Sequence, residues 1–229
     1  MLRILMAATA VMCASTMAMA EDYPCAVSSS TVRFVQSQLA TVVTMDNGGL
    51  FSPNLMWSAV VDRQGQLCSV IKTGDAWPGS REIAIAKAST ANDFSNVKLA
   101  LSTAMLYGPT QPGGSLYGLN NSNPLNPLLR MLPGNGPQKP GGIITFGGGV
   151  ALYSHGQVIG GLGVSGDTSC TDHVIAYRMR RAAGLDGVPG GAGADNISYY
   201  ASGTTITTLD PTQFSQPHCS STDIAPGKI

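Results

Sequence analysis

The 229-residue sequence has few charged side chains and few aromatic ones. Charged residues make up 11% of it, against about 25% in an average globular domain, and the formal net charge is zero. A chain with so little positive charge lacks the electrostatic surface that nucleic acid or anionic lipid requires, so neither is expected as a partner. Its 43% of hydrophobic residues is nonetheless enough to bury a core, which argues against intrinsic disorder.

Long apolar runs are also missing, except near the start of the chain. Arg3 precedes an apolar stretch over residues 4–14 that is too short to span a bilayer, and Ala18-Met19-Ala20 fits a signal-peptidase site. These features predict a signal peptide over residues 1–20 and a periplasmic or secreted protein. A lipoprotein signal is disfavoured because the residue before Cys13 is bulky. No later stretch reaches the ~18 apolar residues that a membrane span needs.

Cysteines are scarce as well, and Cys13 would leave with the signal peptide. The four that remain are Cys25, Cys68, Cys170 and Cys219. An even number in an oxidising compartment predicts two disulfide bonds, with three pairings that the sequence does not decide between. The competing interpretation is a tetrahedral zinc site built from Cys170, His173, His218 and Cys219, although the adjacent His218 and Cys219 make an awkward chelate.

Hydrophobic periodicity predicts an α+β fold. Helices are expected over residues 28–45, 77–94, 97–107 and 168–183. Strands are expected over residues 55–61, 66–71, 143–146, 150–153 and 158–164. Since tight turns rather than crossovers join neighbouring strands, we expect an antiparallel five-stranded sheet with helices packed on it. One domain should occupy residues 21–229, with its core at about 28–185 and a wrapping C-terminal tail over 186–229.

Small residues mark a close contact between one helix and one strand. The helix over residues 77–94 has alanines at one-turn spacing, namely Ala84, Ala88 and Ala91. The strand over residues 158–164 is almost bare, with Gly160, Gly161 and Gly163. The pattern G-x-G-x-x-G that begins at Gly161 is typical of dinucleotide-binding folds, but it needs a βαβ unit that the hairpins here do not supply. We therefore assign these glycines to packing.

Ser165, Asp172 and His173 invite a comparison with serine hydrolases. The nucleophile-elbow pattern fails, because Asp167 stands where its last glycine belongs. Asp172 and His173 are adjacent, so on a helix their side chains point about 100° apart and do not form a relay. No catalytic pair with convincing spacing is present. The backbone N–H groups of residues 166–169, at the start of a helix, remain a candidate site for an anion such as a propionate.

Four segments resemble, in the right order, the motifs of one family. They are residues 57–67, similar to A-V-V-D-x-x-G-x-L; 85–91, similar to A-x-K-A-x-T-A; 147–152, similar to G-G-x-P-L with Ala151 in place of proline; and 158–166 with Asp172, similar to v-i-G-x-I-G-V-S-G…D. Together they resemble the GlcG/HbpS-like haem-binding family, in an exported, cysteine-bearing branch. The resemblance implies a profilin-like fold, a homo-oligomer, and haem or a related tetrapyrrole as cofactor. Members of the family are fused to cobalamin adenosyltransferases, and one secreted member has a sensor kinase as its partner.

The resemblance does not supply an iron ligand for this chain. Haem iron is held by His, Met, Cys or Tyr side chains. We favour His173, because a helix beside the amides of residues 166–169 can offer its imidazole to iron while those amides receive a propionate. The other candidate cofactor-binding residues are Tyr107, Tyr117, Lys87 and Ser165. The sequence thus predicts an exported haem-binding protein; an enzyme acting on a small metabolite near residues 108–142 and 147–149, or a cofactor-free sensing or interaction module, are the alternatives.

Overall fold

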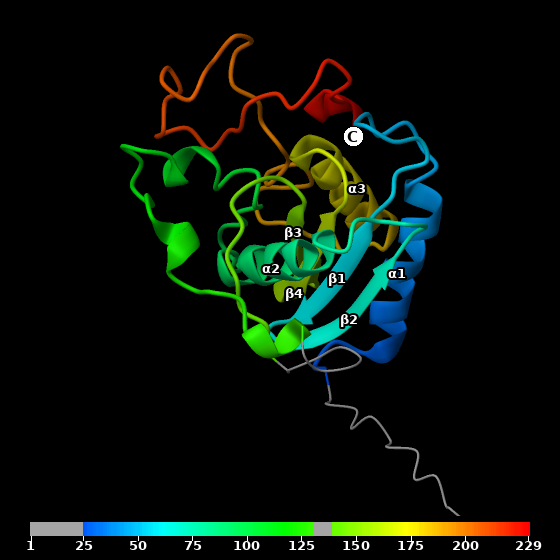
Figure 1. Ribbon diagram of the computed structural model, residues 1–229. Helices are drawn as coiled ribbons and strands as arrows, with labels where there is room; N and C mark the ends of the chain where they lie inside the picture. Colours follow the sequence, from blue (N-terminus) through cyan, green and yellow to red (C-terminus); the bar gives the residue numbers. More distant parts are fainter. Residues whose placement is uncertain (1–24, 131–138) are drawn as a thin grey trace, which may run out of the picture.

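The computed structural model describes residues 25–130 and 139–229 and shows an antiparallel sheet between helices (Figure 1). The sheet has the strand order β2-β1-β4-β3. Its strands are β1 (Trp57–Asp62), β2 (Leu67–Lys72), β3 (Gly149–Ser154) and β4 (Gln157–Ser165). The α-helices in this part of the chain are α1 (Ser29–Val42), α2 (Ser80–Asp93) and α3 (Ser169–Ala182). The predicted α+β class is confirmed, whereas the predicted signal peptide, residues 1–20, lies outside the described residues.

Helices cover both faces of the sheet, so both faces are buried. Alternate residues of a strand point to opposite sides. Ala59 and Val61 of β1 pack with α2 on one side. Val60 of β1 and Leu162 of β4 pack with α1 and α3 on the other. The apolar residues of β1 therefore serve two hydrophobic clusters.

Short polar side chains determine where the first elements begin and turn. The hydroxyl oxygen of Ser28 accepts the backbone N–H of Thr31 at 3.1 Å, which caps α1 at its predicted start. In the turn between β1 and β2, one carboxylate oxygen of Asp62 accepts the N–H groups of Gln64 and Gln66, each at 2.9 Å. The predicted first helix and hairpin are both confirmed.

The predicted close contact between alanines and glycines is confirmed in the packing of α2 on β4. A Cβ atom on Gly161 would overlap the carbonyl oxygen of Ala88, and one on Gly163 would overlap that of Ala84. Only hydrogen at these strand positions lets the helix backbone lie directly on the strand. The G-x-G-x-x-G pattern is therefore a packing feature in an antiparallel sheet.

Replacing Ala88 by leucine should lower the free energy of unfolding by about 1–3 kcal/mol, because the added carbons have no space between α2 and the sheet. Ala88 has no exposed surface. Ala40, which is exposed on α1, gives a matched control, and Ala40→Leu should change stability by no more than about 0.5 kcal/mol. Urea unfolding of the two variants measures the difference, and equal effects would show that α2 does not press on β4.

The prediction of a fifth strand over residues 143–146 was wrong. That segment pairs with no strand, because its donors find other partners: the N–H of Ile144 is donated to the hydroxyl of Thr90 in α2 at 3.0 Å. The outer edge of β3 is instead met by the chain that follows α3, where the N–H of Tyr153 is donated to the carbonyl of Leu185 at 2.9 Å. The sheet therefore has four strands.

The prediction of a helix over residues 97–107 was also wrong. The backbone N–H of Leu101 is donated to the hydroxyl of Ser95 at 3.1 Å, and that of Thr103 is donated to the carbonyl oxygen of Gly149 at 3.1 Å. In a helix both groups would bond to carbonyl oxygens four residues back in the chain, so the helical ladder is not formed. Turns replace the helix. The further short elements are the 3-10 helices η1 (Gly108–Thr110), η2 (Leu119–Asn121), η3 (Pro127–Arg130) and η4 (Pro226–Lys228).

Two disulfide bonds join the four predicted cysteines. The first, Cys25–Cys68, links the segment before α1 to β2, and the second, Cys170–Cys219, links α3 to the tail, residues 186–229. Because the sulfurs of the second disulfide are bonded to each other, they are not thiolate ligands, and the competing zinc site is not formed. Within residues 25–130 and 139–229, none of the helices is long and apolar enough to cross a membrane.

Candidate functional site

A buried ion pair joins two of the helices at the centre of the family motifs. Nζ of Lys87, on α2, lies 2.7 Å from Oδ2 of Asp172, on α3, and neither side chain is more than 2% exposed. Nζ also donates to the carbonyl oxygen of Val164 at 3.0 Å and lies 4.9 Å from the ring centroid of Phe146. The ammonium group of Lys87 is therefore engaged by groups of the protein itself.

The second carboxylate oxygen of Asp172 accepts hydrogen bonds from backbone N–H groups just before α3. Oδ1 accepts the N–H of Gly166 at 3.1 Å and that of Asp167 at 2.9 Å. The N–H of Thr168 is donated to the carboxylate of Asp167 at 2.6 Å. The chain's own carboxylates thus take the place that the sequence suggested for a propionate.

Burial opposes the charges of this pair. It raises the pKa of Asp172 to about 6, although the nearby Lys87 and the backbone donors act in the other direction. Burial likewise lowers the pKa of Lys87. Each charge is retained mainly because the other is present, which makes the pair a strong tie between α2, β4 and α3.

His173, the next residue on α3, has a fully buried side chain. Neither ring nitrogen has a hydrogen-bond partner within the described part of the chain. Burial lowers its pKa to about 4, while the carboxylate of Asp195 acts in the opposite direction. The imidazole is therefore neutral near pH 7 and retains an unshared lone pair, which is the form that binds haem iron. In donor chemistry, His173 fits an iron ligand.

Several groups enclose the His173 ring. The ring of Tyr177 stacks at 6.3 Å between centroids, and Gly147 lies so close that a Cβ there would be 3.0 Å from Cβ of His173. The side chain of Asn196, in the tail, lies near enough to raise the pKa of His173 slightly. Access to the imidazole therefore requires one of these segments, such as the tail, to move.

A second buried ion pair holds this part of the tail. Arg180 of α3 and Asp195 form a two-pronged pair, with Nη2 to Oδ1 at 2.7 Å and no exposed surface on either side chain. Nη1 also donates to the carbonyl of Ala151 in β3 at 3.1 Å. The segment that covers His173 is thus fastened to both a helix and a strand.

The lowered pKa of His173 predicts a dependence of stability on pH. Between pH 6.5 and about 4 the unfolded chain binds a proton at His173 that the folded protein does not. The stability contributed by this group should fall as the pH drops through that range, by up to ~1.4 kcal/mol per pH unit. The raised pKa of Asp172 acts oppositely between pH 3.8 and about 6. Urea unfolding from pH 7 to 4 should therefore show a shallower loss for His173→Leu than for the wild type, and parallel curves would contradict this.

The other predicted binding residues are spread over the molecule. Ser165 ends β4 and is nearly buried, next in the chain to the amides that Asp172 occupies. Tyr107 is half-buried before η1, and Tyr117 is 68% exposed on the irregular stretch. The structure therefore brings Lys87 into the same buried region as His173 but leaves Tyr117 at the surface.

The remaining histidines have different surroundings. His155 lies exposed in the turn between β3 and β4, where Nδ1 is 3.0 Å from the hydroxyl of Ser154. His218 stacks on Tyr199 with centroids 4.1 Å apart, and its Nδ1 lies 3.2 Å from Asp223. A cleft of about 390 Å³ adjoins His218 and is lined by serines, threonine and Asp223. Neither histidine is enclosed as His173 is.

Sequence reasoning missed the residues of the tail that build this region. Asp195, Asn196 and Gln216 lie in a glycine-, serine- and threonine-rich segment without periodicity. No family motif marks them. The available signal was Arg180 itself, next in the chain to Met179 of the predicted inner helix face, because a cation that is buried with such a face needs a partner.

The comparisons with known proteins identify the family. The family described as "Haem degrading protein HbpS-like" matches residues 53–180, which is more than half of the chain. The chain therefore belongs to the HbpS-like family. The match begins just before β1 and ends within α3, so it includes the Lys87–Asp172 pair and His173 but leaves the tail outside.

Individual relatives agree with this assignment. The chain is 34% identical over 118 residues to the corrinoid adenosyltransferase PduO of Citrobacter freundii, but the match spans only 29% of that protein's length. It is 33% identical, over 68% of the relative's length, to a 15.0 kDa uncharacterized protein of Citrobacter freundii. Among solved structures, protein ORFY of Klebsiella pneumoniae matches with a TM-score of 0.52 and 26% identity, covering 68% of this chain and 88% of that one. A structure described as the PduOC:Heme complex matches with a TM-score of 0.51 and 28% identity, covering 68% of this chain and 94% of that one.

Proposed function

We propose that the protein is an exported haem- or tetrapyrrole-binding protein and that His173 is its iron ligand. The observation that carries the proposal is the neutral, unpartnered imidazole of His173 within the segment that matches the HbpS-like family. The related PduOC domain has a structure in complex with haem, which supports the choice of cofactor. Two disulfides are in keeping with export through an oxidising compartment.

The residues around the site have distinct parts in this proposal. His173 supplies a nitrogen ligand, and the Lys87–Asp172 pair fixes the first turn of α3 from which it projects. The enclosing groups exclude water from the imidazole and keep it unprotonated at neutral pH. Bound haem iron would supply ligand exchange and one-electron chemistry. Tyr107 is the alternative ligand, followed by Tyr117, with Ser165 as a further binding residue.

We also propose that the mature chain is one domain over residues 21–229 that associates with further copies of itself. Removal of residues 1–20 would release it to the periplasm or the exterior. There a sensor protein is a candidate partner. The association is what membership of the HbpS-like family supports.

Titration of the purified protein with haemin tests the proposed function. We expect a Soret band distinct from that of free haemin, saturating at a fixed ratio of haemin to protein. A spectrum that equals the sum of protein and free haemin at every ratio would contradict it. In that case a small-metabolite enzyme or a cofactor-free module becomes the better interpretation.

A further inference from the structure

The tail encloses His173 by running along α3 from Arg180 in its last turn to Cys170 in its first. Asp195 is tied to Arg180, and the side chain of Asn196 lies beside the imidazole. Ile197 packs against Cys170 in a small hydrophobic cluster. Because His173 has no exposed surface, this part of the tail acts as its cover.

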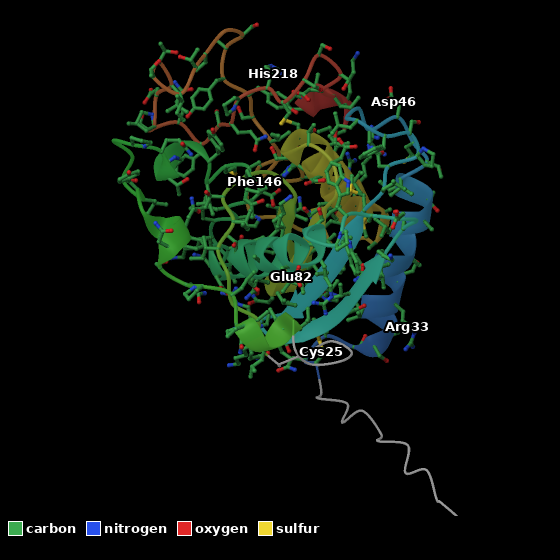
Figure 2. The ribbon with its side chains drawn as sticks, viewed as in Figure 1. Cys25, Arg33, Asp46, Glu82, Phe146 and His218 are labelled. Atoms are coloured by element: carbon green, nitrogen blue, oxygen red, sulfur yellow. A yellow bond between two sulfur atoms is a disulfide. The ribbon has the colours of Figure 1, made fainter. Side chains whose placement is uncertain are left out.

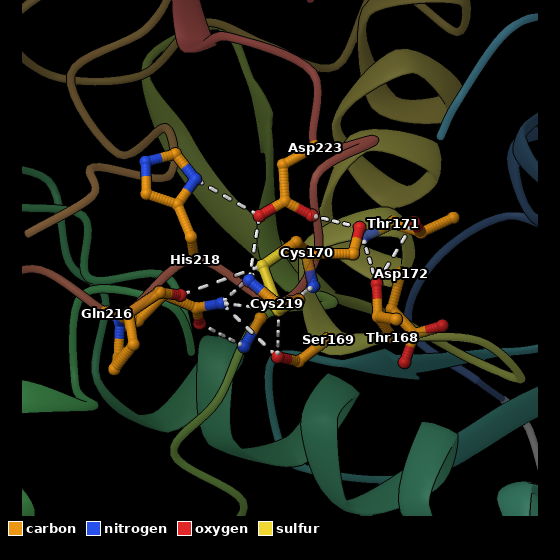
Figure 3. The surroundings of a disulfide bond; sticks show 12 residues. Thr168, Ser169, Cys170, Thr171, Asp172, Gln216, His218, Cys219 and Asp223 are labelled. Carbon is orange, nitrogen blue, oxygen red and sulfur yellow. Dashed lines mark hydrogen bonds and ion pairs between the residues drawn. A yellow bond between two sulfur atoms is a disulfide. The ribbon is translucent and has the colours of Figure 1, made fainter. Parts of the chain in front are cut away.

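Gln216 links the cover to the second disulfide (Figure 3). Its backbone N–H is donated to the carbonyl of Ser198 at 2.9 Å, and its carbonyl accepts the N–H of Tyr200 at 3.1 Å, so two tail segments are paired there. Its side-chain oxygen accepts the N–H of Gly147 at 2.9 Å, and Gly147 lies against His173. Three residues later the tail is bonded covalently to α3.

The groups around the second disulfide, Cys170–Cys219, favour its exchange with an external thiol. Cys219 is exposed whereas Cys170 is buried, so an incoming thiolate meets the Cys219 side first. Cys170 lies in the first turn of α3, where the helix dipole favours a thiolate. The amide Nε2 of Gln216 lies 3.2 Å from Sγ of Cys170, while the N–H of Cys170 and the hydroxyl of Ser169 lie 3.2 and 3.3 Å from Sγ of Cys219. These donors stabilise negative charge on either sulfur.

A carboxylate also faces this bond. Asp223 lies within 4.8 Å of both sulfurs and by itself disfavours a thiolate. Its oxygens accept the N–H of Cys219 at 2.7 Å and the hydroxyl of Ser220 at 3.1 Å, and they lie 3.2 Å from Nδ1 of His218. The negative charge of Asp223 is thus partly satisfied by these three groups. The donors of Gln216, Cys170 and Ser169 still face the sulfurs and favour a thiolate there.

We propose that the second disulfide is a thiol–disulfide exchange site for a dithiol reductant, and that opening it uncovers His173. One thiolate of the reductant bonds to Sγ of Cys219, the S–S bond breaks, and its electron pair leaves on Cys170 as a thiolate. The second thiolate of the reductant then attacks the reductant's first sulfur, which is bonded to Sγ of Cys219 in the mixed disulfide. This breaks the mixed disulfide and releases Cys219 as a thiolate. The reductant becomes a disulfide, two electrons pass to the protein, and the two protein thiolates take up the two protons of the dithiol.

The consequence for haem rests on the proposed function. With the bond closed, only the minor fraction of molecules whose tail is detached exposes the imidazole, and apparent affinity is reduced by that fraction. With the bond open, the covalent tie between α3 and the segment around Gln216 is lost, and the Arg180–Asp195 pair is left to hold the cover, which opens from its Gln216 end. The exchange site would therefore set how readily the protein takes up its cofactor.

The first disulfide provides an internal comparison. Figure 2 shows Cys25 and His218 at opposite ends of the molecule, so the two disulfides are far apart. Cys68 lies within β2, and its sulfur is 3.5 Å from the carbonyl oxygen of Gln66. The carboxylate of Asp62 lies within 4.8 Å of both sulfurs. The second disulfide also has a carbonyl acceptor, that of Pro217 at 3.8 Å from Sγ of Cys170, but it has the donors of Gln216 and Cys170 as well. Because acceptors disfavour a leaving thiolate and donors favour it, the first disulfide should open later.

Stepwise reduction tests the proposal. Oxidised protein is equilibrated with increasing dithiothreitol, quenched with acid and alkylated, and each cysteine is quantified by peptide mass spectrometry. We expect Cys170 and Cys219 to be labelled while Cys25 and Cys68 are still bonded. In protein blocked at that stage, diethyl pyrocarbonate should modify His173 about tenfold faster or more than in oxidised protein. The exposed His155, whose modification rate should not change, is the internal reference.

Two matched variants extend the test. Cys170→Ser/Cys219→Ser should raise the reactivity of His173 without reductant, whereas Cys25→Ser/Cys68→Ser should not. Opening of both disulfides together, or a His173 that stays protected once Cys170 and Cys219 are labelled, would overturn the proposal; both results come from wild-type protein and do not depend on variants folding. A reactive His173 without haemin binding would refute the proposed function alone. Equal haemin affinity through His173 in both thiol states would refute the effect of the exchange site on haem uptake and would leave the proposed function standing.

Discussion

Replacing Asp172 by alanine should lower the free energy of unfolding by about 3–5 kcal/mol, because it leaves the ammonium of Lys87 buried without a counter-charge. Lys87 has no exposed surface to which its charge could turn. The substitution also removes the acceptor for the N–H groups of Gly166 and Asp167, so the first turn of α3 loses its anchor. Urea unfolding at pH 7 without reductant, which keeps both disulfides closed, measures the loss.

A double variant separates the charge from the rest of the site. Lys87→Met/Asp172→Leu removes both charges and replaces them with apolar groups of similar volume, which often costs little or even stabilises a protein. We expect the double variant to be more stable than Asp172→Ala, although each of the two unpaired amides still costs about 1–3 kcal/mol in both variants. A loss below about 1 kcal/mol for Asp172→Ala would show that the pair does not hold α2 to α3.

Replacing Asp195 by alanine should cost a similar amount, about 3–5 kcal/mol, by leaving the guanidinium of Arg180 buried and unpaired. Both side chains lack exposed surface, and the pair fastens the tail to α3. The loss should be accompanied by faster reaction of His173 with diethyl pyrocarbonate, because the tail segment that brings Asn196 beside the ring is no longer held to α3 by this pair. Thermal unfolding and peptide mapping measure the two effects.

The matched control lies on the same helix. Arg181 and Asp186 form an ion pair at 3.7 Å, but Arg181 is half-exposed. Exposed pairs of this kind contribute about 0–1 kcal/mol, so Asp186→Ala should have a small effect. Equal losses for Asp195→Ala and Asp186→Ala would mean that burial of the Arg180 pair does not matter for stability.

The elements that the sequence predicted well are those with a local cause. The hairpin between β1 and β2 follows from Asp62, whose carboxylate satisfies the turn amides, and α1 begins at a serine that caps it. The contact of α2 with β4 was predictable because alanines and glycines at matching positions leave the two backbones free to meet. In each case the residues that determine the structure lie within a few positions of it or share a regular spacing.

The errors arose where distant residues competed with the local pattern. Residues 143–146 have the apolar character of a strand, but the hydroxyl of Thr90 takes the N–H of Ile144. Residues 97–107 have helical spacing, but the carbonyl oxygen of Gly149 takes the N–H of Thr103. Neither partner can be recognised from the segment alone, since each depends on how the chain returns.

The candidate site was predictable only in part. The family motifs pointed to Lys87, Ser165 and His173. They did not show that Lys87 is used in an ion pair that holds the fold together, whereas the imidazole of His173 is left without a hydrogen-bond partner among the described residues. That distinction depends on Asp195, Asn196 and Gln216, which reach α3 from a tail without periodicity. The disulfide pairing depends on the same approach, because Cys219 meets Cys170 only when the tail lies over the helix.

Haemin titration of His173→Ala beside His155→Ala tests most directly whether His173 binds the iron. The titrations should be made on oxidised protein and on protein with Cys170 and Cys219 reduced and blocked. We predict that the wild type and His155→Ala give the same shifted Soret band, and that His173→Ala loses or displaces this band in both thiol states. A His173→Ala variant that is folded and has the wild-type Soret maximum and affinity would show that another residue, with Tyr107 as the next candidate, binds the iron.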